Sequence, residues 1–325
     1  METIKTIFSR FLLILAALTI TSSDVFSQDW KLIEFPSYDH LTDIVMVSAD
    51  SGLVVTASGY CFRTSNRGKN WQKSAVIKNI RLESLYFENS RNGWVCGHRG
   101  SIFKTSDGGS SWNDVSIEDA DAIFFDIEMK DSLTGVAVGM RPLESNPYNG
   151  IAVRTVDGGK NWEKIEASGL AFSEIKQSRL KNKFFFMAMG RLNISNDDGK
   201  SWQSVATLEG APARTFSIYG QTGIMAGPKG TLGYSNDSGK TWYSKEQDKK
   251  KTFLCSILLS SQHGIIAGSK GEMMVTFDGG INWAEEKTPL ELTILDMCII
   301  DNYLFAVGSD GLIMYKEITV EESKE

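Results

Sequence analysis

The chain has 325 residues, an apolar content of 42% and a formal net charge of −6 at pH 7. That apolar content is ordinary for a globular protein and excludes an intrinsically disordered chain. A moderately acidic protein is also a poor candidate for general nucleic-acid binding, so we expect no nucleic-acid partner.

The N-terminal segment has the pattern of a secretory signal peptide. Lys5 and Arg10 precede an apolar run at 11–20, and a small-residue site follows at 25–27. The run is too short to span a bilayer, which needs roughly 20 residues. The small-residue site contains no cysteine to which a lipid could be attached. We therefore predict a signal peptide over 1–27 that is cleaved near Ser27, leaving a secreted or periplasmic protein with no membrane span.

Tryptophan recurs at a nearly fixed interval along the rest of the chain. Seven of the eight tryptophans are separated by 41, 41, 50, 40, 40 and 41 residues. They are Trp30, Trp71, Trp112, Trp162, Trp202, Trp242 and Trp283. A period near 40 residues indicates one supersecondary unit repeated along the chain.

Each repeat is predicted to form four short β-strands. In the second repeat, β-rich runs at 82–87, 93–97 and 101–104 are followed by a glycine-rich turn and a strand that begins at Trp112. Four-stranded units of about 40 residues arranged radially make a β-propeller. The sequence therefore predicts an all-β, single-domain, seven-bladed β-propeller over 28–318, followed by an acidic C-terminal tail over 319–325.

The two ends of the repeat region predict how the ring closes. The last repeat supplies only three strands, at 292–300, 303–308 and 312–315, whereas the N-terminal segment 29–31 matches a fourth strand. We expect this N-terminal strand to complete the last blade, which removes exposed sheet edges. The longer interval of 50 residues arises from an insertion at 140–149, which we place between the second and third strands of blade 3.

A short turn motif precedes six of the tryptophans. It reads Thr-Ser-Asp-Gly-Gly-Ser-Ser-Trp at 105–112, and its third position is Asn66, Asp107, Asp157, Asp197, Asp237 or Asp278. The motif resembles the Asp-box, or bacterial neuraminidase repeat. Its carboxylate can accept hydrogen bonds from the backbone amides of the turn, and its glycine can adopt positive φ. Its tryptophan can bury a ring whose N–H finds a hydrogen-bond partner. These tryptophans are Trp71, Trp112, Trp162, Trp202, Trp242 and Trp283. One carboxylate per turn is too few for calcium, so we interpret the motif as structural.

A longer pattern extends the resemblance to a family. Residues 93–112 read Gly-Trp-x-x-Gly-x-x-Gly-x-Ile-x-x-Thr-x-Asp-Gly-Gly-x-x-Trp, which resembles the photosystem II stability/assembly factor-like propellers. The resemblance covers about 30–316. It implies an exported propeller with an assembly or scaffold role and an arginine-rich patch on one face.

The sequence holds no recognisable catalytic or metal-binding motif. His40, His98 and His263 lack metal-ligand spacing, and there is no nucleophile elbow or phosphate loop, so we predict no catalytic residue, no metal and no cofactor. Cys61, Cys96, Cys255 and Cys298 are interpreted as small buried residues, with Cys61–Cys96 or Cys255–Cys298 bridges as the alternative.

Cationic residues cluster at one predicted set of turns. The turns between strands two and three lie opposite the Asp-boxes, and five of the seven hold Lys or Arg. Segments leading into the first strands add Lys78, Arg81, Arg214 and 249–251 on the same side. We therefore predict a basic binding face around the channel mouth. It consists of His98, Arg99, Arg141, Tyr148 from the insertion, Arg191, Lys229, Lys270, Arg81 and Arg214.

These expectations favour one function and leave a second open. The favoured function is an exported, non-catalytic propeller, expected to be a monomer, that binds a protein or other anionic partner on the face opposite the Asp-boxes. The alternative is a glycan-directed protein, either a sialidase-like glycosidase or a lectin-like binder. Its carboxylates would come from Asp119, Asp121, Asp126, Glu174 and Asp296.

Overall fold

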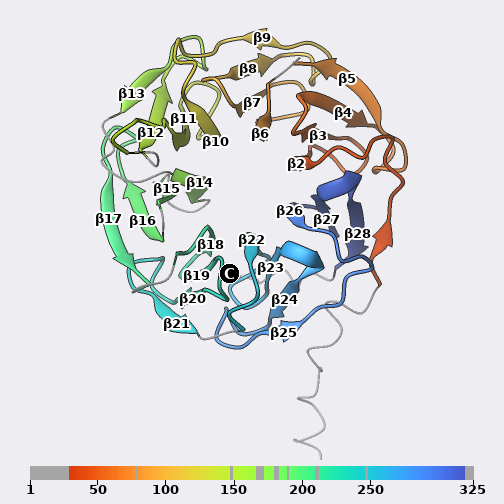
Figure 1. The fold of residues 1–325 in the computed structure, drawn as a ribbon, viewed down its shortest axis with the longest axis vertical. Coiled ribbons are helices and arrows are strands. Elements are labelled where there is room, and N and C mark those ends of the chain that lie inside the picture. Colours follow the sequence, from red (N-terminus) through yellow and green to blue (C-terminus); the bar gives the residue numbers. More distant parts are fainter. Residues whose placement is uncertain are drawn as a thin grey trace, which may run out of the picture.

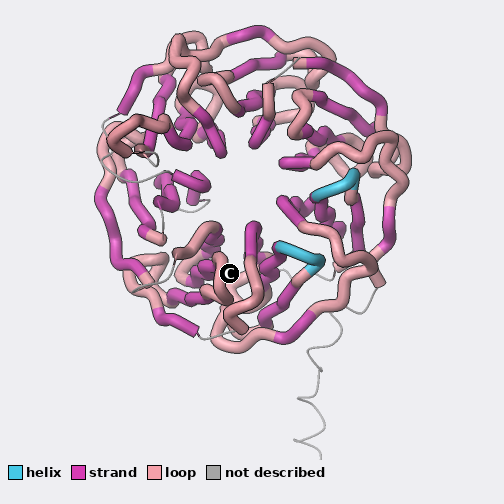
Figure 2. Tube along the Cα trace, viewed as in Figure 1, coloured by secondary structure: helices cyan, strands magenta, loops and turns pink. Residues whose placement is uncertain are grey.

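The computed structural model describes eight stretches of the chain: 29–77, 80–146, 149–165, 172–178, 183–188, 190–208, 212–245 and 248–318. The predicted signal peptide at 1–27 and the predicted tail at 319–325 lie outside them. Strands make up most of the described chain, and the two helices are single 3₁₀ turns, η1 (Ser269–Gly271) and η2 (Ser309–Gly311) (Figure 2).

The strands form seven four-stranded antiparallel sheets around a central channel (Figure 1). Blades 1 to 3 follow one another in the chain, and their strands run from the channel outwards in sequence order. Blade 1 contains β2 (Leu41–Met46), β3 (Gly52–Thr56), β4 (Tyr60–Thr64) and β5 (Gln72–Val76). Blade 2 contains β6 (Leu82–Phe87), β7 (Gly93–Gly97), β8 (Ile102–Thr105) and β9 (Asn113–Asp114). Blade 3 contains β10 (Ile123–Met129), β11 (Gly135–Met140), β12 (Gly150–Thr155) and β13 (Glu163–Ile165).

Blades 4 to 6 repeat the same order. Blade 4 contains β14 (Phe172–Ser178), β15 (Lys183–Ala188), β16 (Arg191–Ser195) and β17 (Gln203–Thr207). Blade 5 contains β18 (Thr215–Tyr219), β19 (Thr222–Ala226), β20 (Leu232–Ser235) and β21 (Tyr243–Lys245). Blade 6 contains β22 (Phe253–Leu258), β23 (Gly264–Gly268), β24 (Met273–Thr276) and β25 (Ala284–Glu285).

Blade 7 joins the two ends of the described chain. It contains β26 (Ile294–Ile300), β27 (Tyr303–Gly308), β28 (Ile313–Glu317) and, as its outermost strand, β1 (Lys31–Leu32). Lys31 pairs with Tyr315 and Leu32 with Met314. Trp30 then donates a hydrogen bond of 3.2 Å to Glu286, which also holds the buried ammonium of Lys316. The predicted fold and the predicted closure by the N-terminal strand are confirmed.

The hydrophobic core lies between neighbouring blades. One cluster joins Leu41 and Ile44 of blade 1 to Phe305 and Val307 of blade 7, and similar clusters fill the other interfaces. The second strand of a blade is the most buried, and every residue of β3, β7 and β23 is buried. Burial on both faces explains why these strands are apolar and glycine-rich rather than alternating.

The Asp-box turns have the expected hydrogen bonds. Asp107 accepts the backbone N–H of Ser111 at 2.9 Å and its hydroxyl at 2.6 Å, and Asn66 accepts the N–H of Asn70 at 2.9 Å. Gly109 occupies the left-handed region at φ 80°, where a side chain would be strained. Each turn is therefore closed by contacts within its own blade.

The expected partner for each indole N–H is found in only some blades. Trp242 and Trp283 donate to the carbonyls of Gly239 and Gly280, each at 3.0 Å. The Nε1 atoms of Trp71, Trp94, Trp112, Trp162 and Trp202 have no hydrogen-bond partner among the described residues. Burial of a ring of about 200 Å² at roughly 25 cal/mol/Å² stabilises by more than the ~1–3 kcal/mol that one unmade hydrogen bond costs, so the ring is retained.

All four cysteines are free, which makes the Cys61–Cys96 and Cys255–Cys298 bridge alternatives wrong. Burial raises the pKa of the Cys61 thiol to about 12, so this side chain behaves as a small apolar residue.

Candidate functional site

The propeller has two faces with different turns. The turns between strands one and two and the Asp-box turns between strands three and four lie on one side, which we call the Asp-box face. The turns between strands two and three and the connections between blades lie on the other side, which we call the mouth face. This assignment follows from the antiparallel order of every sheet.

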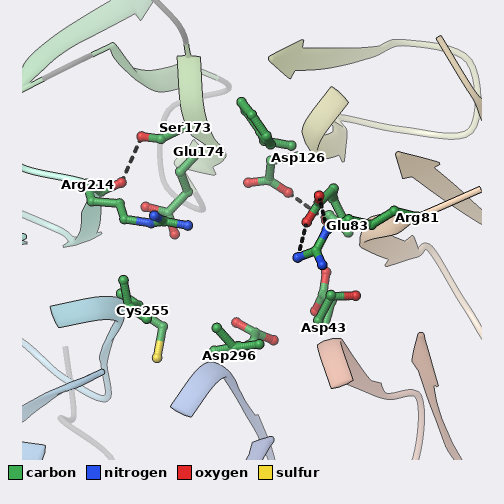
Figure 3. Close-up of a pocket in the computed structure, with 14 residues that line it drawn as sticks. Asp43, Arg81, Glu83, Asp126, Ser173, Glu174, Arg214, Cys255 and Asp296 are labelled. Atoms are coloured by element: carbon green, nitrogen blue, oxygen red, sulfur yellow. Dashed lines mark hydrogen bonds and ion pairs between the residues drawn. The ribbon is translucent and has the colours of Figure 1, made fainter. Parts of the chain in front are cut away.

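The central channel opens on the mouth face as a cavity of about 320 Å³. Its wall is built from the first residues of the innermost strands, with Arg81 and Arg214 from the segments that lead into β6 and β18 (Figure 3). The other charged residues of the wall are acidic, and they come from five different blades. They are Asp43, Glu83, Asp126, Glu174 and Asp296.

These carboxylates line the cavity because the innermost strands are bulged at the same place. Six of the seven innermost strands shift register at their second or third residue, for example between Leu41 and Asp43 and between Phe124 and Asp126. A β-bulge turns a side chain away from its regular direction and increases the local twist. In blade 7 the close approach needs a glycine on the second strand, because a Cβ on Gly308 would lie 1.8 Å from the carbonyl oxygen of Thr293.

Several of the cavity carboxylates bind the neighbouring blade. Asp43 accepts the backbone N–H of Leu85 at 2.8 Å, Asp126 that of Ile175 at 2.8 Å, and Glu174 that of Phe216 at 2.8 Å. Asp296 accepts the N–H of Ile44 at 3.3 Å. These contacts tie blade 1 to 2, blade 3 to 4, blade 4 to 5 and blade 7 to 1, so the acidic residues serve the ring structurally.

The surroundings of two cavity carboxyls, Asp43 and Asp126, favour their protonated forms. Burial, together with the charge of Glu174, raises the pKa of Asp126 to about 7. Burial and the neighbouring Asp296 raise the pKa of Asp43 well above its usual range. Lys176 contributes a cation next to these carboxyls, and its ammonium lies 2.8 Å from Glu174. Burial lowers the pKa of Lys176, but the charge of Glu174 outweighs this effect and raises the pKa to about 12.

The predicted basic residues fall into two groups. Arg99, Lys229 and Lys270 occupy equivalent positions in their turns, with φ of 61°, 56° and 56°. Like Arg191 and Arg214, they are exposed, and none of the five makes an ion pair with another residue in the described stretches.

The remaining basic residues are already paired. Arg81 and His98 both contact Glu83, at 2.6 and 2.9 Å. Arg141 lies 2.9 Å from Asp119 and 3.6 Å from Asp121. Although burial opposes ionisation of Asp119, hydrogen bonds from Lys164 and Arg141 lower its pKa. Tyr148 and Lys78 lie outside the described residues.

Only three of the five carboxylates named for a glycosidase lie together. Asp126, Glu174 and Asp296 line the channel mouth, whereas Asp119 and Asp121 are held by Arg141. Within the described ranges no three His, Cys, Asp or Glu residues are grouped so that they could hold a metal ion. The same ranges contain no helix with the length and apolar character to cross a membrane.

Sequence reasoning missed Asp43 and Glu83, and it missed that the mouth itself is acidic. A signal was present, since Asp43, Asp126, Glu174 and Asp296 each stand two residues after the first buried apolar residue of an innermost strand. These four carboxylates lie in repeats that are far apart in the sequence. Their equivalent positions can be recognised only once the strands of the blades have been aligned with one another.

Comparisons with known proteins agree with this geometry. The family model for the photosynthesis system II assembly factor YCF48 matches residues 22–120 and 77–172. A curated relative, the photosystem II assembly lipoprotein Ycf48 of Synechococcus sp. (strain CC9902), is 25% identical over 142 residues, which are 42% of this chain and 40% of that protein. The match therefore spans less than half of the relative's length.

Solved structures show the same fold at low identity. YCF48 bound to D1 peptide has a TM-score of 0.73 and 17% identity, and the superposition covers 90% of this chain and 97% of that one. YCF48 from Cyanidioschyzon merolae has a TM-score of 0.71 and 15% identity, with 89% and 99% covered. The WD40 propeller domain of Doa1 follows at 0.70 and 12%, with 90% and 96% covered. Together with the sequence matches, these structures support the family resemblance.

Proposed function

We propose that this chain, a photosystem II assembly factor-like β-propeller, is an exported, non-catalytic protein that binds a protein partner on its mouth face and acts as an assembly or scaffold factor. The family model and the curated relative support the assembly role. One structural neighbour carries a bound D1 peptide, which supports a protein segment as the class of ligand.

The observation that carries the proposal is the set of free cations on the mouth face. Arg99, Lys229 and Lys270 are exposed at equivalent turns and lack carboxylate partners among the described residues. A cation without a partner keeps its charge available to an incoming anionic group and raises the rate of encounter. We therefore assign the partner site to the predicted basic residues and to Tyr148 of the blade 3 insertion.

The charge-reversed variant Arg99→Glu/Lys229→Glu/Lys270→Glu tests the proposal. We expect it to lose capture of the partner from the native envelope, while its melting temperature stays within a few degrees of wild type, because the three side chains make few contacts. The matched variant Lys160→Glu/Lys200→Glu/Lys240→Glu makes the same change of charge at exposed positions of the Asp-box turns. Capture that survives in the mouth-face variant would contradict the proposed site.

Export is part of the proposal. We infer a signal peptide over 1–27, cleaved near Ser27, and a propeller over 28–318. The first cysteine of the sequence is Cys61, so the lipid attachment implied by the relative's name has no thiol near this site. Mass spectrometry of the protein from the periplasm would be expected to find Gln28 at its N-terminus.

A glycan-directed function is the second candidate, because carboxylates line the mouth. A glycosidase needs two carboxyl groups roughly 5–10 Å apart, with one held protonated near neutral pH, and Asp126 has such a raised pKa. We disfavour this function because Asp126 and Glu174 accept backbone amides of the next blade. A panel of fluorogenic sialosides and glucosides is expected to show no turnover. Turnover that disappears in Asp126→Asn would favour the enzyme instead.

A further inference from the structure

The free cations of the mouth face are unevenly distributed around the ring. We propose that blades 4 to 6 form one cationic sector, which binds an acidic stretch of a protein partner and fixes the partner's orientation against the opposite side of the ring. This inference rests on the proposed function and adds to it the position and the charge of the bound segment. The cation sector consists of Arg191, Arg214, Lys229, Lys249, Lys250 and Lys270.

The cation sector is continuous in the structure. Ser173 of β14 donates a hydrogen bond of 2.8 Å to the carbonyl of Arg214, which ties blade 4 to the segment before blade 5. The turn that holds Lys229 is bound to the next connection, since Gly230 donates to the carbonyl of Lys251 at 2.8 Å. Ser269 donates to the carbonyl of Thr252 at 2.9 Å and so places Lys270 beside the same connection.

The cations of this sector outnumber the carboxylates beside them, which include Asp248, Glu272 and, next to the Lys270 turn, Glu291. All six cations are exposed and make no ion pair with another described residue. Asp248 and Glu272 each accept a backbone N–H, from Lys250 and Thr252 respectively, at 3.0 Å. Lys251 differs from its neighbours because it is paired with Glu285 at 2.5 Å, and we leave it out of the sector.

Blades 2 and 3 also hold basic residues on this face, but most of these are paired with carboxylates. Glu83 contacts both Arg81 and His98, and Asp119 contacts both Arg141 and Lys164. Arg99 is the one predicted cation of these two blades that is exposed and without an ion pair in the described stretches. An isolated charge binds an acidic segment more weakly than several charges that lie within a Debye length of about 8 Å.

Blades 7 and 1 complete the asymmetry with the opposite charge. Asp310 occupies the turn position that Lys229 and Lys270 hold elsewhere, with φ 55°. The connection beside it brings Asp39, whose carbonyl accepts the N–H of Gly311 at 2.9 Å. The corresponding turn of blade 1, 58–60, contains no cation. An acidic segment is therefore attracted to one side of the ring and repelled from the other.

The test divides the mouth-face cations by sector and uses a defined probe, a fluorescein-labelled peptide with eight consecutive glutamates. Its binding to the full chain would be measured by fluorescence anisotropy at low and at physiological salt. We expect Lys229→Glu/Lys270→Glu to weaken binding by about tenfold or more at low salt. Arg99→Glu, in an equivalent left-handed turn, should weaken it by less than about threefold and by less than Lys229→Glu alone, which changes the charge by the same amount. Equal melting temperatures of the two variants would confirm that both are folded.

Two outcomes would overturn the sector. One is an equal loss of binding in both variants, which indicates an even ring of charge. The other is unchanged binding in Lys229→Glu/Lys270→Glu. Failure of the proposed function has a different signature: the peptide binds through blades 4 to 6, yet no envelope protein is captured by wild type and released in the triple variant. If a partner is captured but the peptide does not bind, the proposed function stands and the cation sector is wrong.

Discussion

The two faces of the propeller use carboxylates in opposite ways. On the Asp-box face, hydrogen bonds from Ser111 and Thr105 lower the pKa of Asp107 to about 2, and the carboxylate is open to solvent. On the mouth face, burial and the charge of Glu174 raise the pKa of Asp126 to about 7. Both side chains organise backbone amides, but the first acts within one turn and the second acts between blades.

The cations differ between the faces in the same systematic way. On the Asp-box face they bridge blades, as when Lys104 donates to the carbonyl of Gly158 at 2.7 Å and Arg154 to that of Asp198 at 2.6 Å. On the mouth face Lys229 and Lys270 extend from their turns without such a contact in the described residues. A charge whose hydrogen bonds are already made stabilises the fold, whereas a charge without them is available for binding.

The largest expected effect on stability comes from removing an Asp-box carboxylate. Asp197 accepts three hydrogen bonds, from the hydroxyl and N–H of Ser201 at 2.6 and 2.9 Å and from the hydroxyl of Ser195 at 2.9 Å. We expect Asp197→Ala to lower the free energy of unfolding by about 2 kcal/mol in urea denaturation. Asp197→Asn, which copies the natural Asn66, should lose less than half as much. Equal losses would show that the charge, rather than the acceptor oxygen, closes the turn.

A smaller effect separates the two kinds of carboxylate by pH. Since the pKa of Asp126 is about 7 in the folded chain against 3.8 in its ordinary state, the stability that this group contributes is full below about pH 4 and is lost as the pH rises towards 7. Asp157 and Asp197, with pKa values of about 2, contribute stability above about pH 4 that is lost as the pH falls towards 2. Asp126→Asn should therefore reduce the decline in unfolding free energy between pH 6 and 8 by about 1–2 kcal/mol.

In Asp126→Asn the unfolding free energy should still decline somewhat as the pH rises, because the pKa of Asp43 is raised as well. The loss of unfolding free energy below pH 4 should be the same in Asp126→Asn as in wild type. A variant with the same slope as wild type on the alkaline side would show that Asp126 is ionised in the folded protein at all of these pH values.

The smallest effects distinguish the cations. Arg154→Met removes the bridge to Asp198 and is expected to cost about 1 kcal/mol of unfolding free energy. Lys229→Met should change it by less than about 0.5 kcal/mol, because an exposed side chain without partners contributes little. If the two variants were equally destabilised, the cations of the mouth face would be structural and the contrast between the faces would fail.

The fold could be predicted from the sequence because each blade repeats a motif that specifies its local structure. The box of 105–112 and its copies specify turns by residue type alone, and the segment 29–31 supplied the missing strand found at Lys31–Leu32. The arrangement of side chains at the channel mouth depends on contacts between repeats. For that reason it could be predicted only in part. Arg81 and Arg214 were placed on the correct side, but their acidic neighbours and the pairing of Arg141 with Asp119 depend on how the blades pack.

Closure of blade 7 by β1 has a consequence for the order of folding. Lys31 is among the first propeller residues to leave the ribosome, and its partner Tyr315 is among the last. Each of blades 1 to 6 can form from consecutive residues, but the outermost strand of blade 7 must wait for almost the whole chain. The ring can therefore close only after the residues of β28 are available to pair with β1.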